Sequence, residues 1–366
     1  MTATTRPLEP PHLSAPRLRG PGVRRTWVPM AVAAVLMVGV SMLALCTGPV
    51  AVPPSEVIGT LLAHVPLLHF HTSTPAINQA VVWQLRAPRV VLAGVVGAML
   101  ASGGAAYQGL FRNPLADPYL LGVAAGAGLG ATIDIVEAGD SSALLPVFAF
   151  VGGSLAVAAT YLIGVAGGRR AWGRSIVLAG VAVAALLTAI QTYLQQRDQQ
   201  QIRQIYDWIL GSFSVASWSD VTLILPYVVL SAAVLLAHRR MLDVLRVGEE
   251  EAGTLGIHPA RTRLIVVAAA TLGTAAAVSV SGLIGFVGII VAHTVRLTAG
   301  ASYRIILPVA VVGGAAFLIG TDLIARTVQA PAEVPIGVVT ACIGAPFFLV
   351  VLVSRRAGRG IGAGDT

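Results

Sequence analysis

The chain has 366 residues, of which 56% are hydrophobic and only 11% are charged, and its formal net charge is +8. A soluble core of this length cannot bury that much apolar surface, so the composition excludes an ordinary soluble globular protein. All 24 basic residues are arginine, and a nucleotide-binding P-loop needs a lysine on the phosphates, so a standard Walker A site is excluded too.

Apolar stretches of about 20 residues, long enough to cross a bilayer as helices, recur along the whole chain. They predict an all-α polytopic membrane protein with ten transmembrane helices in two pseudo-repeated halves of five. Five is an odd number, so the second half would enter the membrane in the opposite sense, as in the inverted repeats of transporters. The expected spans are 27–47, 90–111, 118–137, 143–166, 175–195, 221–238, 262–281, 283–298, 304–325 and 335–353.

The two ends of the chain differ from the spans. Residues 1–26 are rich in proline and arginine without hydrophobic periodicity, which predicts a disordered cytoplasmic tail. Residues 27–355 form the predicted ten-helix transmembrane domain, and 356–366 form a short cytoplasmic tail. A cleaved signal peptide in place of the first helix is disfavoured, because its apolar run exceeds a typical signal core.

The arginines predict the orientation of the chain. With both termini in the cytoplasm, 19 arginines fall on the inner side, as the positive-inside rule requires. Only five fall outside, and these are Arg86, Arg89, Arg197, Arg203 and Arg326. The arginine distribution therefore predicts a multi-pass protein of the cell inner or plasma membrane.

The first external loop, 48–89, has room only for a short helix near 54–65 and a few turns. It contains His64, His69 and His71, and His69-x-His71 could in principle bind a metal ion or haem iron. A loop without a third fixed ligand is usually solvated, and the two cysteines, Cys46 and Cys342, have no metal-ligand spacing. No metal site is predicted.

The turn between the second and third spans reads Q-G-L-F-R-N-P-L-A-D-P-Y-L-L-G, from Gln108 to Gly122. Arg112 and Asn113 end one helix and Pro114 prevents its continuation. Asp117 before a proline is a good N-cap. The segment indicates a specialised hairpin of a membrane protein at the inner face, and an ordinary helix–helix turn is the alternative that explains the capping residues as well.

The loop after the sixth span reads V-G-E-E-E-A-G-T-L-G-I, from Val247 to Ile257. Three glutamates stand in what would be the first turn of a short helix, where negative charge favours the helix dipole, and Gly256 is placed to end it. This segment is either a solvated turn or a surface on which an ATPase docks.

These segments together resemble the permease subunits of type II ABC importers, the FecCD-type family that takes up ferric siderophores, haem and vitamin B12. The resemblance extends from about Trp83 to Arg355. The motifs are L-R-A-P-R (85–89), Y-Q-G-L-F-R-N-P-L-A-D-P (107–118), W-I-L-G-S-F (208–213), G-E-E-E-A-G-T-L-G (248–256), G-L-I-G-F-V-G-I-I-V-A-H-T-V-R (282–296), D-L-I-A-R (322–326) and E-V-P-I-G-V-V-T-A-C-I-G-A-P-F-F (333–348).

The resemblance implies the type II permease fold and a dimer with a second copy or a close paralogue, around a central path. It further implies cytoplasmic ATPase subunits that bind ATP and Mg²⁺, an external substrate-binding lipoprotein, and no cofactor on this chain. The implied ATPase coupling helix contains Gly248, Glu249, Glu250, Glu251, Ala252, Leu255 and Gly256, with Glu249 and Leu255 as contacts. Two residues depart from the family pattern: Gly253 replaces a longer side chain and Ala292 replaces a proline.

The resemblance also assigns Arg86, Arg89 and Arg326 to docking of the binding protein through its glutamates, where charge complementarity sets register and on-rate. A local pair of Arg326 with Asp322, one helical turn earlier, is the structural alternative, and both can hold.

The expected activity is ATP-driven import of an iron chelate, most naturally a ferric siderophore, with haem or cobalamin as alternatives. Residues that could line the path are Gln191, Thr340 and Pro346, and the proline is expected to kink the last span; the two polar residues could equally face water. An ion-coupled secondary transporter is the rival class, but it would place ionisable residues at mid-bilayer, and the spans hold almost none. No nucleic-acid partner is predicted.

Overall fold

The computed structural model describes residues 24–65, 73–138, 143–167, 172–246, 248, 253 and 258–360, and within these ranges the secondary structure is helical, without strands. The helices in chain order are α1 (Arg24–Cys46), α2 (Pro54–Ala63), α3 (Ala76–Ala80), the π-helix η1 (Val81–Arg86), α4 (Ala87–Leu110), the 3₁₀ helix η2 (Pro118–Leu121), α5 (Val123–Ala138), α6 (Leu145–Ala166), α7 (Trp172–Arg197), α8 (Ile202–Ile209), α9 (Trp218–Ala237), α10 (Arg239–Leu245), α12 (Pro259–Ser281), α13 (Val287–Ala299), α14 (Tyr303–Thr327) and α15 (Ile336–Gly360).

Each of the ten predicted spans corresponds to a helix. Seven helical stretches of the described chain are long and apolar enough to cross a membrane, and α13 and the Ile336–Val351 part of α15 are shorter apolar helices. The tenth is α5, with 16 residues. The short helix expected in the first loop is present as α2.

Three spans differ clearly from their predicted limits, and one of them is the last, because α15 continues past residue 353 to Gly360, into the predicted tail. The second begins earlier than residue 90, because α3, η1 and α4 form one continuous helical stretch from Ala76 to Leu110. Pro88 does not interrupt it, and the turn directly before this proline is the π-helix η1, in which the backbone N–H of Ala87 donates to the carbonyl oxygen of Val82. The third is divided, because Gly122 adopts a left-handed φ of 86° between η2 and α5.

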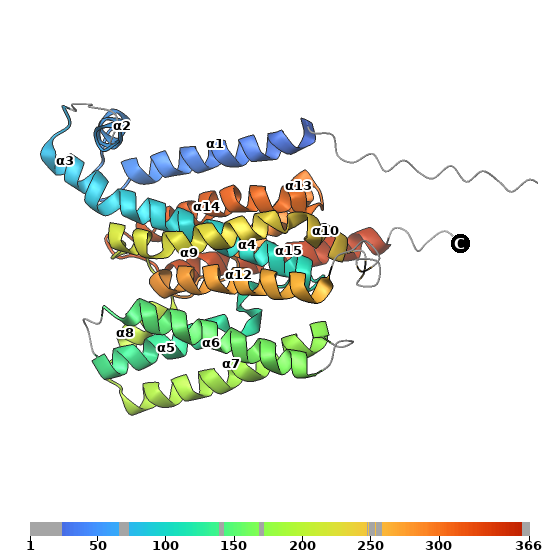
Figure 1. The fold of residues 1–366 in the computed structure, drawn as a ribbon. Coiled ribbons are helices and arrows are strands. Elements are labelled where there is room, and N and C mark those ends of the chain that lie inside the picture. The colour runs from blue at the N-terminus through green and yellow to red at the C-terminus, as the bar shows by residue number, and fades with distance from the viewer. Residues whose placement is uncertain are drawn as a thin grey trace, which may run out of the picture.

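Helix α4 lies at the centre of the bundle and packs against α14, α12, α13 and α9. Figure 1 shows α1 along one side, where it packs on α14, and α5, α6 and α7 together on the opposite side. The helices run side by side along one common direction. The bundle therefore has two ends, called here the α2 end and the α10 end after the short helices found there (Figure 1).

Helices α4 and α14 approach each other closely enough that their backbones touch. A Cβ added at Gly97 would lie 2.3 Å from the carbonyl oxygen of Gly314, a distance that no larger residue tolerates. Small residues permit such contact between membrane helices, where burial of apolar surface from water supplies little driving force.

The first residues of α1 and the last residues of α15 lie at the α10 end (Figure 1). An even number of crossings has this consequence, as the ten-helix prediction requires.

Candidate functional site

Three arginines predicted to face the outside meet at the α2 end of the bundle. Arg86 ends η1, Arg89 lies in the first turn of α4, and Arg326 lies in the last turn of α14. The continuous helix through η1 and α4 places Arg86 and Arg89 about one turn apart. With Asp322 and Glu333, these arginines form what we call the ion cluster.

Arg89 binds both acidic residues of the ion cluster. Its Nε and Nη2 donate to the Asp322 carboxylate at 3.0 and 2.8 Å, and its Nη1 and Nη2 donate to Glu333 at 2.8 and 2.9 Å. The side chain of Asp322 is 3% exposed, whereas that of Glu333 is 38% exposed. Fork-like pairing of this kind suits the planar guanidinium and compensates the burial of its charge.

Arg86 and Arg326 bind the end of α1 instead. Arg86 donates from Nη1 to the carbonyl oxygens of Leu45 (2.8 Å) and Cys46 (3.2 Å), and from Nη2 to that of Val50. Arg326 donates to the carbonyl oxygen of Ala44, a short contact. The last carbonyls of a helix lack intrahelical donors and carry partial negative charge, so both arginines cap α1 and join it to the bundle.

The alternative expected for Arg326, a local ion pair with Asp322, is present only as a long contact. Its Nε lies 4.0 Å from the Asp322 carboxylate, beyond hydrogen-bond distance, and the Asp322 oxygens accept from Arg89 instead. Docking by Arg86, Arg89 and Arg326 stays a prediction, and their side chains point into the protein rather than away from it.

The predicted turn after the second span begins as expected and then folds inward. Helix α4 ends at Leu110, Arg112 adopts a left-handed φ of 52°, and Arg112 and Asn113 are exposed. The chain then runs back along α4, because the Pro118 ring comes within 3.5 Å of a Cβ placed at Gly103. The first part of the turn therefore lies at the surface, where Leu115 is exposed as well, and its later part is buried from Ala116 to Pro118 except for the half-buried Asp117.

Asp117 is an N-cap, as predicted. Its Oδ1 accepts from the backbone N–H of Tyr119 at 2.9 Å, and a proline follows it at the first position of η2. The hydroxyl of Tyr119 bonds the backbone N–H and carbonyl of Ile284, both at 3.0 Å. The cap thus fixes η2 against the break between α12 and α13. Asn113 caps more locally, accepting from the N–H of Leu115 just after Pro114.

The predicted path residues do not form one cluster. Gln191 on α7 is buried against α5, with Oε1 3.0 Å from a Cβ placed at Gly128. Thr340 is buried in α15 and its hydroxyl donates to the Gly337 carbonyl at 3.0 Å. Pro346 lies inside α15 and is exposed. A lining role for these residues stays a prediction.

Most of the predicted coupling helix lies outside the described residues, and this applies to Glu249, Glu250, Glu251, Ala252, Leu255 and Gly256. Gly248 is described and is buried. Along the chain, Gly248 follows α10 and precedes α12. His69 and His71 also lie outside the described residues, and the described part of the chain holds no group of three or more potential metal ligands.

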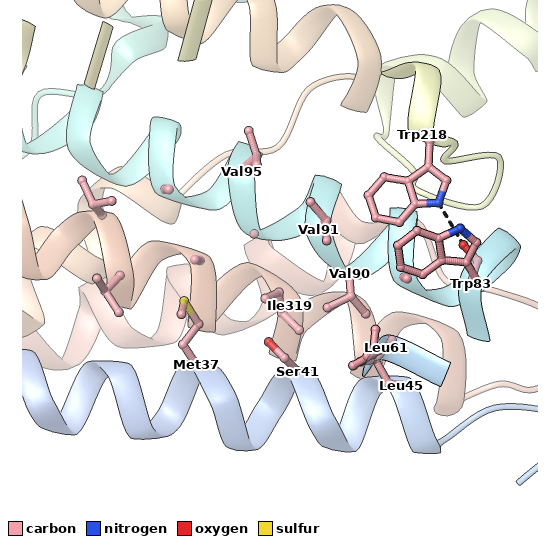
Figure 2. A pocket seen from close by; sticks show the side chains of 16 residues that line it. Met37, Ser41, Leu45, Leu61, Trp83, Val90, Val91, Val95, Trp218 and Ile319 are labelled. Atoms are coloured by element: carbon pink, nitrogen blue, oxygen red, sulfur yellow. Dashed lines mark hydrogen bonds between the residues drawn. The ribbon is translucent and has the colours of Figure 1, made fainter. Parts of the chain in front are cut away.

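A cavity of about 470 Å³ opens between α1, α4 and α14 near the α2 end. Figure 2 shows Met37, Leu45, Val90 and Ile319 around it. At its edge the indole of Trp218 donates to the Trp83 carbonyl at 2.9 Å. Its walls are almost wholly aliphatic and aromatic, so it offers no set of donors for a polar chelate.

Sequence reasoning paired Asp322 only with Arg326 and missed both acidic partners of Arg89, of which the more distant along the chain is Glu333. The residue stands in the quoted motif beginning at 333, but 244 positions separate it from Arg89, and no periodicity relates two such distant positions. The alternative pair with Arg326 was found because it is local.

The sequence profile of the FecCD transport family matches residues 34–354. The chain belongs to the FecCD transport family. Among curated proteins, this FecCD permease is 43% identical over 282 residues to the cobalamin import system permease protein of Halobacterium salinarum, covering 77% of this chain and 76% of that one. It is 41% identical over 297 residues to the hemin transport system permease protein of Yersinia pestis, covering 76% and 85%.

A solved structure assigned to a metal-chelate type ABC transporter in an inward-facing conformation matches this FecCD permease with a TM-score of 0.76 and 28% identity. The match covers 89% of this chain and 98% of that one. The predicted fold class and family are therefore confirmed. The protein is a multi-pass membrane permease, a transport subunit of the ABC importer type.

Proposed function

We propose that this permease imports an iron chelate, a ferric siderophore in the first instance, from an external binding protein into the cytoplasm. The observation that carries the proposal is the family match over 34–354, with relatives named for hemin, cobalamin and iron uptake. Haem and cobalamin are the alternative cargoes. Two relatives above 40% identity are named for cobalamin import and hemin transport, which supports these alternatives.

The working assembly has two copies of this chain, or one copy and a paralogue, with the path between them. ATPase subunits that bind ATP and Mg²⁺ dock on the cytoplasmic side, which is the α10 end. The argument for this orientation is electrostatic, because the arginines of the described chain gather at that end and the positive-inside rule places them in the cytoplasm. The α2 end then faces the binding protein.

The ion cluster is the proposed docking surface for the binding protein. It has three arginines against two carboxylates and therefore an excess of positive charge. Glu333 is its most exposed member, so an acidic side chain of the partner reaches Arg89 by replacing Glu333, without unpacking Asp322. Such contacts act mainly on register and on-rate.

The segment from Gly248 to Gly256 is the proposed coupling helix, with Glu249 and Leu255 against the ATPase. Replacing both with alanine is expected to abolish cargo uptake while the permease still folds and inserts. Normal uptake by this double variant, measured beside the wild type in liposomes, would contradict the coupling role.

The function is tested by ATP-dependent uptake into liposomes that contain the permease and its ATPase, with the binding protein outside. A ferric siderophore, haem and cobalamin are offered in parallel. Uptake of one of them supports the importer and identifies its cargo. If none of the three cargoes is taken up although the ATPase is assembled and active, the proposal is wrong for all three cargoes.

An ion-coupled secondary transporter predicts uptake without ATP. The described helices provide little support for an ion-binding site at mid-bilayer, because Asp322 is bound by Arg89 and Asp134 lies near the end of α5. Uptake driven by a proton or sodium gradient in liposomes without the ATPase would favour this alternative.

A further inference from the structure

The short helix α10 is tied to the beginning of α14 by a carboxylate. The Oδ2 of Asp243 accepts from the hydroxyl of Ser302 at 2.7 Å, and its Oδ1 accepts from the backbone N–H of Tyr303, also at 2.7 Å. Tyr303 is the first residue of α14. The carboxylate therefore closes the N-terminus of a long helix from a neighbouring one, where the helix dipole favours negative charge.

A second side chain of the same segment holds the same place. Arg246, just past the end of α10, donates to the carbonyl oxygen of Ala301, and its guanidinium lies 5.8 Å from the centre of the Tyr303 ring. Asp243 and Arg246 are three residues apart, and together they form hydrogen bonds with the three successive residues 301–303. We call these five residues the α10 clasp.

Tyr303 extends the α10 clasp to two further helices. Its side chain is 3% exposed, and its ring lies 2.9 Å from a Cβ placed at Gly109 near the end of α4. Its hydroxyl accepts from Nη2 of Arg296 on α13 at 3.4 Å, and the same nitrogen donates to Oε1 of Gln108 at 2.9 Å. Helices α4, α10, α13 and α14 thus meet at one buried ring.

The opposite end of the same helix pair carries the ion cluster. Helix α14 has 25 residues and a length of about 38 Å at 1.5 Å per residue. Near its far end Asp322 binds Arg89 of α4. Helices α4 and α14 are therefore joined at one end by the Arg89–Asp322 pair and at the other by the packing of Tyr303 on Gly109, with Arg296 of α13 bridging Tyr303 to Gln108. Between these ends Gly97 contacts Gly314. We expect a pair joined at three places along its length to move as one body.

We infer that Asp243 is a positioning residue that ties the ATPase side of the permease to the α4–α14 pair, so that this pair relays binding-protein docking at the ion cluster to the ATPase. The inference rests on the proposed function, because α10 is the described helix that leads into the proposed coupling segment. Two sites at opposite ends of one rigid pair are coupled when both bias the position of that pair.

The test compares ATP hydrolysis with and without binding protein, using permease–ATPase complexes in lipid nanodiscs. For Asp243→Ala we expect the ATPase to remain bound and its basal rate to stay near that of the wild type. Stimulation by the binding protein should fall by about two- to thirty-fold, the range by which residues between coupled sites alter coupling. Asp243→Asn should retain most of it, since its amide oxygen still accepts from the Tyr303 N–H.

Asp220 provides the matched control. It closes the capping box of α9, accepting from the N–H and hydroxyl of Ser217 at 2.9 and 2.6 Å, at the end of α9 remote from α10. Asp220→Ala removes a carboxylate cap of the same kind and is expected to lower thermal stability to a similar extent. It should leave stimulation by the binding protein unchanged.

Stimulation of Asp243→Ala equal to that of the wild type would overturn the inference alone. If that variant fails to assemble, Ser302→Ala takes its place, because it removes one of the two hydrogen bonds that Asp243 accepts from the beginning of α14; undiminished stimulation there also overturns the inference. A wild-type complex that the binding protein does not stimulate would also overturn the inference, whereas failure of the proposed function is recognised separately, by the absence of cargo uptake into liposomes.

Discussion

At the scale of single residues, the ion cluster shows how a membrane protein accommodates arginines among apolar helices. Asp322 is almost fully buried and accepts three hydrogen bonds from Arg89, while Glu333 covers the same guanidinium from the exposed side. The two carboxylates carry the same charge and bind the same partner. Their different burial nevertheless predicts different consequences when either is neutralised.

Asp322→Asn is expected to destabilise the permease by about 3 kcal/mol, because it leaves a buried guanidinium with too little countercharge. Glu333→Gln should cost less than about 1 kcal/mol, since water already screens the ion pair between Arg89 and this exposed carboxylate. Thermal unfolding of the two variants in detergent, side by side with the wild type, checks the ranking. Equal losses would mean that Arg89 does not depend on burial of its partner.

Asp117 offers a second test at this scale. Asp117→Ala removes the oxygen that accepts from Tyr119 and is expected to cost about 1 kcal/mol, as for other N-caps. Asp117→Asn keeps an acceptor in the same place and should cost a fraction of that. The melting temperatures of both variants decide this, and an asparagine variant as unstable as the alanine one would show that charge, not the cap, is required.

At the scale of elements, the α4–α14 pair depends on the absence of side chains at its crossing. Gly97→Ala places a methyl group 2.3 Å from the Gly314 carbonyl oxygen, so the helices must separate. We expect a loss of stability of about 1–3 kcal/mol, as for other overpacked contacts, and reduced transport where protein still assembles.

Gly39 on α1 is the control for this substitution, because a Cβ there meets nothing within 4 Å. Gly39→Ala should be neutral or stabilise the helix by up to about 1 kcal/mol. Similar thermal stability of the two alanine variants would contradict the close approach of α4 and α14.

At the scale of the whole molecule, the proposed orientation places α2 outside the cell and the beginning of α14 inside. A variant without Cys46 and Cys342 permits the test, with Ser55→Cys at the α2 end and Ala301→Cys at the α10 end. Both positions are exposed. A membrane-impermeant thiol reagent should label position 55 in intact cells and position 301 only after permeabilisation. The reverse pattern would invert the proposed topology and the direction of transport.

The sequence by itself determined the membrane class, the ten helices, the Asp117 cap and the family, because apolar length, cap residues and local motifs are properties of contiguous segments. It also indicated which arginines the positive-inside rule does not explain, since only five fell on the outer side.

The tertiary structure decided which distant side chains meet. Arg89 pairs with Glu333 across 244 positions and Asp243 closes α14 across 59, and local pattern carries no information on either contact. It also decided that Arg86 and Arg326 cap the end of α1 and that the chain after Asn113 folds back along α4. These outcomes depend on how helices pack around α4, and such packing is set by the sum of many small contacts rather than by any one segment.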